Sequence, residues 1–148
     1  MNYKRFNDYA GWAVWLVATI VYLLTIEPTA SFWDCGEFIA SAYKLEVGHP
    51  PGAPMFMLIA RLFAMFVPAV YAATAVNVMS AMASSFTILF LFWSITHLAQ
   101  KLSMTRWTEG QTEPTSAQRL AILGSGAVGA LAYTFSDSFW FSAVEGEV

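Results

Sequence analysis

Residues 74–100 have the sequence TAVNVMSAMASSFTILFLFWSITHLAQ, and this stretch decides the fold class of the chain. It contains no Asp, Glu, Lys or Arg over its whole length. Crossing the hydrocarbon core of a membrane takes about 20 consecutive, mainly apolar residues in an α-helix. We therefore expect residues 74–100 to form a membrane-spanning helix.

Two further apolar runs, residues 9–26 and 120–136, are also long enough to span a membrane. The first run follows the basic pair Lys4 and Arg5, as the apolar part of a signal peptide does. However, it is longer than is usual for a signal peptide, and the Glu27–Ala30 segment makes a poor cleavage site. We therefore predict three spans, the first of which is a retained membrane anchor.

The composition agrees with a membrane protein. Hydrophobic residues make up 57% of the 148 residues and charged residues 11%, whereas soluble domains carry about 25% charged residues. A net charge of -3 provides no basic surface for nucleic acid. A single cysteine, Cys35, excludes an internal disulfide and a metal cluster built from cysteines. The sequence predicts an all-α integral membrane protein, built as a polytopic helical bundle.

The charges predict the orientation in the membrane. The N-terminus is basic before the first span, and the loop 101–119 carries Lys101, Arg106 and Arg119, whereas the loop 27–73 is mainly acidic. Because short loops rich in Lys and Arg stay in the cytoplasm, we expect the N-terminus and residues 101–119 there and residues 27–73 outside. We expect the bacterial inner membrane as the location.

A fourth apolar stretch, residues 52–67, lies inside the predicted outer loop and is bracketed by Pro54 and Pro68. A helix of this length reaches roughly 24 Å, which is less than the roughly 30 Å of the hydrocarbon core. If this stretch crossed the membrane, the basic loop 101–119 would also lie on the wrong side. We predict an interfacial helix here.

The same outer loop holds the clearest candidate for chemistry. Residues 36–46 have the apolar spacing of an amphipathic helix, which we expect to lie flat on the membrane. Asp34 and Glu37 have the spacing of a helix cap and its partner three residues later. Asp34 is therefore either a cap for this helix or a general base that accepts a proton from a substrate hydroxyl. The two roles are compatible.

Three prolines interrupt the chain between Gly48 and Pro54 and end the amphipathic helix. Such a cluster is typical of a rigid connector. His49 within it is alternatively a hydrogen-bond donor to an anionic group of a substrate. No His or Cys lies near it at the spacing of a metal site, so we predict no metal.

The pattern GSGAVG at residues 124–129 matches the dinucleotide-binding fingerprint. That fingerprint requires a preceding strand, whereas here the glycines lie inside a predicted span. Small residues that allow helices to pack closely explain the pattern better.

Four segments resemble a known family: PTASFWDCGEF at 28–38, GHPPG at 48–52, VNVMSA at 76–81 and FWFSAVEGEV at 139–148. Together they are similar to the N-terminal region of glycosyltransferase family 117, membrane proteins related to protein O-mannosyltransferases within the GT-C superfamily. The resemblance implies a GT-C type bundle with juxtamembrane helices in the first outer loop. Family members carry many more spans, so we expect the chain to continue beyond residue 148.

The resemblance also implies roles for individual residues. The catalytic carboxylate of the first outer loop would be Asp34, and Glu37 beside it is a further catalytic candidate. Glu145 and Glu147 lie where the superfamily has a second acidic residue, and they are candidates for substrate binding, as His49 is on its own chemistry. Lys44 and Arg61 are candidate clamps for a donor phosphate, although snorkelling of both side chains at the interface is the simpler explanation.

The implied function is transfer of a hexose such as mannose from a lipid-phosphate sugar to a hydroxyl acceptor at the outer face of the membrane. We expect no cofactor beyond this co-substrate, and the expected partners are membrane lipid, the lipid-linked donor and a protein or glycan acceptor. Two alternatives stay open: a transporter or flippase for lipid-linked intermediates, because carboxylates in membranes also mark transport pathways, and a non-catalytic membrane subunit. We expect this fragment alone to be inactive.

Overall fold

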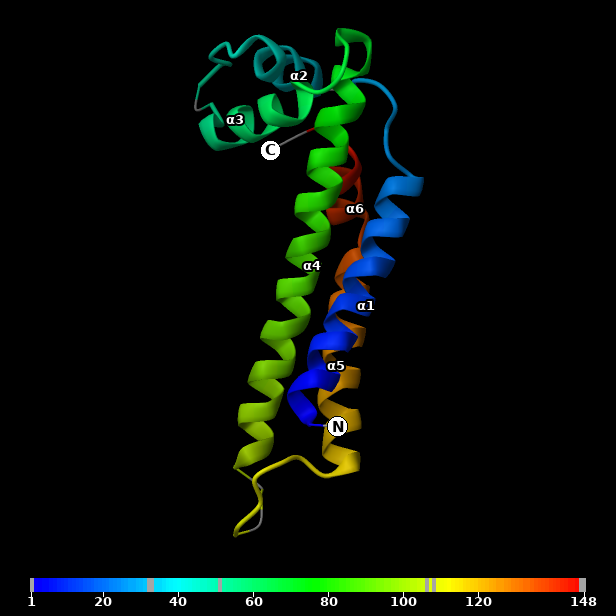
Figure 1. Ribbon diagram of the computed structural model, residues 1–148, viewed down its shortest axis with the longest axis vertical. Coiled ribbons are helices and arrows are strands. Elements are labelled where there is room, and N and C mark those ends of the chain that lie inside the picture. Colours follow the sequence, from blue (N-terminus) through cyan, green and yellow to red (C-terminus); the bar gives the residue numbers. More distant parts are fainter. Residues whose placement is uncertain (1, 32–33, 51, 106, 108, 147–148) are drawn as a thin grey trace. The chain divides into compact units, whose positions relative to one another are not determined.

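A computed structural model describes residues 2–31, 34–50, 52–105, 107 and 109–146, and every regular element among them is a helix (Figure 1). The α-helices are α1 (Tyr3–Leu24), α2 (Cys35–Lys44), α3 (Pro54–Ala64), α4 (Ala72–Met104), α5 (Ser116–Thr134) and α6 (Asp137–Val144), and a 3₁₀ turn, η1 (Ala69–Tyr71), precedes α4. The prediction of an all-α chain is therefore confirmed. The helices group into two compact units.

One helix, Ala69–Met104, is long and apolar enough to cross a membrane, judged by length and composition over the described residues. A second candidate results if α5 and α6, which meet at a bend of 66°, are counted as a single span. The predicted span 74–100 lies within the first of these helices. The three-span topology stays a prediction.

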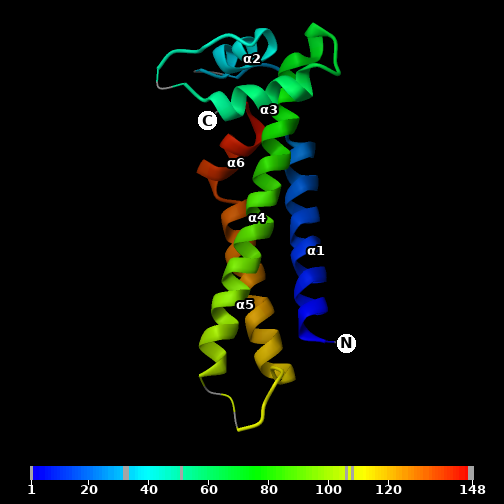
Figure 2. The same cartoon turned by 60° about the vertical axis from the view of Figure 1, so that its left-hand side comes forward.

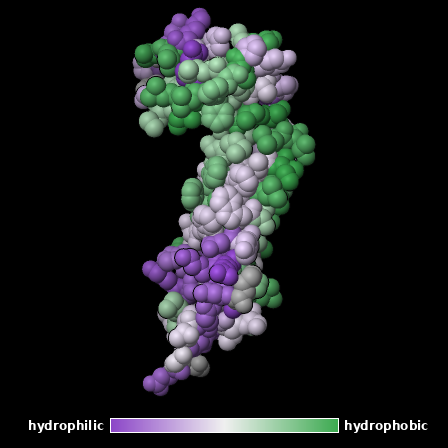
Figure 3. All heavy atoms as spheres, viewed as in Figure 1, coloured by the Kyte–Doolittle hydropathy of each residue, from purple (hydrophilic) through white to green (hydrophobic). Residues whose placement is uncertain are grey.

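The first unit comprises the chain up to Ala18 and Ser85–Ser136, and its helices lie side by side in Figure 2. Gly126 and Gly129 of α5 allow close packing, as predicted: a Cβ atom on Gly126 would lie 2.5 Å from Thr96 Cγ2, and one on Gly129 would lie 2.7 Å from Ile95. Figure 3 shows hydrophilic residues gathered at the end of this unit that carries the start of α1 and the loop before α5.

The start of α5 shows that the predicted loop 101–119 is shorter than expected. Thr115 accepts a hydrogen bond from the backbone N–H of Gln118, and the Gln118 side chain accepts one from the backbone N–H of Thr115. This is a capping box, a motif that satisfies two of the free N–H groups at a helix start. Helix α4 ends at Met104 and α5 begins at Ser116, so the connection is shorter than the predicted loop at both ends.

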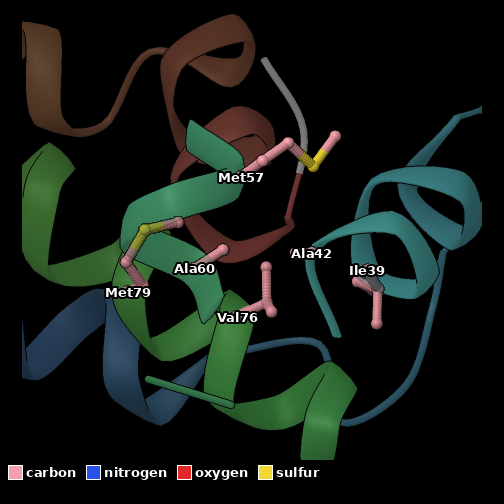
Figure 4. Packing of buried hydrophobic residues seen from close by; sticks show 6 residues of the cluster. All are labelled: Ile39, Ala42, Met57, Ala60, Val76 and Met79. Carbon is pink, nitrogen blue, oxygen red and sulfur yellow. The ribbon is translucent and has the colours of Figure 1, made fainter. Parts of the chain in front are cut away.

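The second unit comprises Thr19–Ser84 and the residues from Asp137 onward. Its core is an apolar cluster from three helices (Figure 4): Ile39 and Ala42 from α2, Met57 and Ala60 from α3, and Val76 and Met79 from α4. The apolar side of α2 therefore packs against α3 and α4 in this unit. Sequence reasoning anticipated α2 and α3 but missed α6.

Two local features end α2 and begin α3. Leu45 adopts a left-handed conformation with φ 56°, and the N–H groups of Leu45 and Glu46 bond back to the carbonyls of Ala42 and Ser41. This backbone turn ends α2. Pro54 stands in the first turn of α3, where its missing N–H costs no helical hydrogen bond. With 11 residues, α3 reaches only roughly 16 Å, which is shorter than the helix predicted for residues 52–67.

Candidate active site

Asp34 stands at the start of α2, with its side chain exposed to solvent. It occupies the N-cap position, but its carboxylate forms no capping hydrogen bond with the first turn, which lies wholly in the described residues. The expected capping box with Glu37 is therefore wrong. The backbone of Asp34 has φ -84° and ψ -3°, which is helical, whereas a capping side chain needs an extended backbone at this position.

Glu37 binds the Pro-rich connector instead. Its Oε1 accepts a hydrogen bond from the backbone N–H of His49 at 2.7 Å, and its Oε2 lies 2.9 Å from the ring Nδ1 of His49. Glu37 and His49 are 12 residues apart in the chain, so these bonds close the connector onto α2. This contact fits the interpretation of the segment as a connector, whereas the role of His49 toward a substrate stays a prediction.

His49 completes the link to Asp34. Its Nε2 lies 3.9 Å from Oδ2 of Asp34, so the imidazole stands between two carboxylates. The side-chain hydrogen bond to Glu37 raises the pKa of His49 above its usual 6.5. The backbone and side-chain hydrogen bonds from His49 lower the pKa of Glu37 below its usual 4.5. Both shifts favour a charged imidazolium facing a charged carboxylate.

Glu145 also contacts the segment between α1 and α2. Its Oε2 accepts a hydrogen bond from the hydroxyl of Ser31 at 2.6 Å and lies 3.7 Å from the buried thiol of Cys35. Glu145 thus lies beside the residue that follows Asp34 in the chain. A pocket of about 250 Å³ opens next to it, lined by Thr25, Glu27, Asp137, Trp140, Phe141 and Val144.

The segment before the site is fastened by residues that sequence reasoning did not single out. Asn77, which is completely buried, donates to the carbonyls of Glu27 and Thr29 at 2.7 and 3.1 Å. Trp140 in α6 donates to the hydroxyl of Thr25 at 3.0 Å. A polar amide inside an apolar helical stretch was the available signal, because buried polar groups in proteins nearly always have hydrogen-bond partners.

The two candidate phosphate clamps already have partners within the second unit. The guanidinium of Arg61 donates to the carbonyl of Tyr43 and lies 5.4 Å from the centre of the Tyr43 ring, which joins α3 to the end of α2. Lys44 is exposed and lies 3.8 Å from Glu46. Their role toward a phosphate stays a prediction.

Two further predictions concern metal binding and Glu147. In the described part of the chain, no group of three His, Cys, Asp or Glu side chains has the arrangement of a metal site. Glu147 lies outside the described residues. What the arrangement offers chemically is an exposed carboxylate, Asp34, that can accept a proton.

Comparison with known proteins identifies the family. A family model described as the protein O-mannosyl-transferase TMEM260 N-terminal domain matches residues 34–148. Protein O-mannosyl-transferase tmem260 of Dictyostelium discoideum is 27% identical over 137 residues, which are 91% of this chain and 14% of that protein. Protein O-mannosyl-transferase TMEM260 of Mus musculus is 32% identical over 87 residues, which are 59% of this chain and 12% of that protein.

The chain therefore spans only about one seventh of the length of these relatives. No solved structure matches it. Both relatives are eukaryotic, so the comparisons give no support to the expected bacterial inner membrane. The resemblance to protein O-mannosyltransferases is confirmed, and the family match begins at Asp34 itself: the chain belongs to the family of the protein O-mannosyl-transferase TMEM260 N-terminal domain.

Proposed function

We propose that this chain is the N-terminal part of a membrane glycosyltransferase of the GT-C type. The enzyme transfers a hexose such as mannose from a lipid-phosphate donor to a hydroxyl group, with protein Ser and Thr side chains as the acceptors. The names of the two relatives support a mannosyl transfer to protein. The lipid-phosphate donor follows from the resemblance to the GT-C superfamily.

In this reaction Asp34 is the general base. Its carboxylate takes the proton of the acceptor hydroxyl while the acceptor oxygen forms a bond to C1 of the sugar. The bond between C1 and the phosphate oxygen breaks, and the lipid phosphate leaves with the electron pair. Because phosphate is a good leaving group, the reaction needs a base opposite it more than it needs an acid.

The observation that carries this assignment is the state of the Asp34 carboxylate. It is exposed, it stands at the start of a helix, and it forms no capping bond there. A carboxylate without a capping role at this position remains available to a substrate. The Glu145 carboxylate accepts a hydrogen bond from Ser31. This contact supports the proposal that the acidic segment after α6 contributes to the same site.

A transfer assay tests the proposed activity. The purified full-length protein is incubated with a lipid-phosphate mannose and a peptide that contains Ser and Thr. We expect mannosylated peptide and free lipid phosphate in equal amounts. Absence of transfer, combined with movement of the lipid-linked sugar across reconstituted vesicles, would contradict the proposal and favour a flippase.

The proposal includes an orientation with α2 and α3 on the outer or lumenal side and the loop after α4 in the cytoplasm. Single cysteines at Glu46 and Glu109, both exposed, test it with an impermeant thiol reagent. Cys35 can be kept in the background because it is buried. We expect labelling of Glu46→Cys, but not of Glu109→Cys, from outside intact cells or from the lumenal side of vesicles. The reverse pattern would overturn the orientation.

A further inference from the structure

The geometry around His49 points to a role that goes beyond the base itself. We propose that His49, held by Glu37, is a positioning residue that fixes the Asp34 carboxylate for proton transfer. This inference rests on the proposed role of Asp34 as the base. It assigns Glu37 a supporting function in place of direct contact with the substrate.

His49 is attached to Glu37 at two points. Both its backbone N–H and its ring Nδ1 lie within hydrogen-bonding distance of the same carboxylate, at 2.7 and 2.9 Å. Two attachments to one group fix the position of the residue and the orientation of its ring together. With Nδ1 occupied by Glu37, Nε2 is the ring atom left to face Asp34, at 3.9 Å from Oδ2.

The surrounding residues hold this attachment in place. The N–H of Gly52 bonds to the carbonyl of His49 at 2.9 Å in a tight turn, where Gly52 has φ 70°. A Cβ atom on Gly48 would lie 3.1 Å from Oε1 of Glu37, so the glycine leaves room for the carboxylate at the backbone. The Phe38 ring lies beside the imidazole, with a centroid distance of 6.5 Å.

The charge on His49 matters for its contact with Asp34. Its hydrogen bond to Glu37 raises its pKa, so it is a cation over more of the neutral range than a free histidine. The other cations of α2 and α3 are engaged elsewhere: Arg61 with the Tyr43 carbonyl, and Lys44 with Glu46. Among the ion pairs of the described residues, Asp34 pairs with His49 and with no Lys or Arg.

The Asp34 carboxylate needs such a partner to act as a base. An exposed carboxylate without a capping bond rotates freely, and a general base must lie within about 2.6–3.2 Å of the proton that it removes. An imidazolium beside Oδ2 draws that oxygen to one side and leaves Oδ1 for the acceptor hydroxyl. The contact at 3.9 Å is an ion pair rather than a hydrogen bond, and contacts of this kind commonly tighten when substrate binds.

The pH dependence of transfer by the full-length protein tests this role. In the wild type, we expect kcat to fall as the pH rises through the raised pKa of His49, because the cation is lost. His49→Gln should remove this fall and lower kcat by up to about 100-fold, the cost of a misplaced catalytic group, with an unchanged KM for the acceptor. Glu37→Gln should move the fall in kcat to lower pH.

His97→Gln is the matched control, because His97 is the second of the two histidines and is exposed on α4. It should leave both the rate and the pH profile as in the wild type. A wild-type kcat or a wild-type pH profile in His49→Gln would overturn the positioning role. If His49→Gln does not fold, the Glu37→Gln profile decides, and a fall in kcat at the wild-type pH overturns the inference.

The outcome also separates this inference from the proposed function. Normal transfer by Asp34→Asn would remove the base and the positioning role together. An inactive Asp34→Asn with a fully active His49→Gln would remove only the positioning role.

Discussion

The Oε1 atom of Glu37 accepts a hydrogen bond from the backbone N–H of His49 at 2.7 Å, and the Oε2 atom of Glu37 lies 2.9 Å from the ring Nδ1 of His49. This pair joins α2 to the Pro-rich connector that leads to α3. It also brings the imidazole to 3.9 Å from Asp34. The Glu37–His49 pair therefore determines the local geometry around the proposed base.

The first prediction concerns the titration of this pair. Since the His49 pKa is raised, its contact with Glu37 contributes fully below pH 6.5 and is lost as the pH rises through the raised value. Since the Glu37 pKa is lowered, the contact contributes fully above pH 4.5 and is lost as the pH falls through the lowered value. The connector should thus be held most firmly between about pH 4.5 and 6.5.

Two measurements check this prediction. The His49 ring, followed by NMR, should titrate above 6.5, and Glu37→Gln should bring its pKa back toward 6.5. The protection of the backbone amides of residues 46–49 against exchange, relative to the intrinsic rate at each pH, should be greatest within the pH window given above. A His49 titration that does not respond to Glu37→Gln would refute the prediction.

The second prediction uses two glycines of α5 that differ only in their neighbours. Gly126→Ala places a Cβ 2.5 Å from Thr96 Cγ2, and Thr96 is itself held by its bond to the Trp93 carbonyl. This overpacking should cost about 1–3 kcal/mol. Gly124→Ala meets nothing within 4 Å and should be neutral or stabilise α5 by up to about 1 kcal/mol. Thermal unfolding midpoints of the full-length protein in detergent compare the two, and equal midpoints would contradict the packing.

The third prediction concerns the buried amide in α4. Asn77→Leu removes the donor of two hydrogen bonds, to the carbonyls of Glu27 and Thr29, and each lost bond costs about 0.5–1.5 kcal/mol. Thr74→Val is the control, because Thr74 makes a single exposed bond to the Pro28 carbonyl and should cost less than about 1 kcal/mol. The expected order of thermal midpoints is wild type, then Thr74→Val, then Asn77→Leu. A midpoint for Asn77→Leu at or above that of Thr74→Val would contradict the role of the amide.

Much of the fold could be predicted because hydrophobic periodicity and length are local properties of the sequence. The stretch 74–100 lies within α4, and α2 begins and ends within two residues of the predicted helix 36–46. The missed helix α6 has only 8 residues. It follows α5 after a bend of 66°, and the predicted span 120–136 ended just before it.

The candidate site was harder to predict because its geometry depends on contacts between distant residues. The sequence spacing of Asp34 and Glu37 indicated a mutual capping box. In the structure, Glu37 contacts His49 instead, because the left-handed turn at Leu45 reverses the chain after α2. The contact of Glu145 with Ser31 spans 114 positions, and only the resemblance to a family pointed to it.

The most direct test of the central claim is the transfer rate of Asp34→Asn in the full-length protein. Asn keeps the size of the side chain but cannot accept the proton. Because Asp34 makes no capping bond, the thermal midpoint should stay that of the wild type. The rate should fall by about 10²–10⁴-fold, the usual contribution of a general base. A rate close to that of the wild type would contradict the assignment of Asp34 and move the search for the base to Glu145 and Glu147.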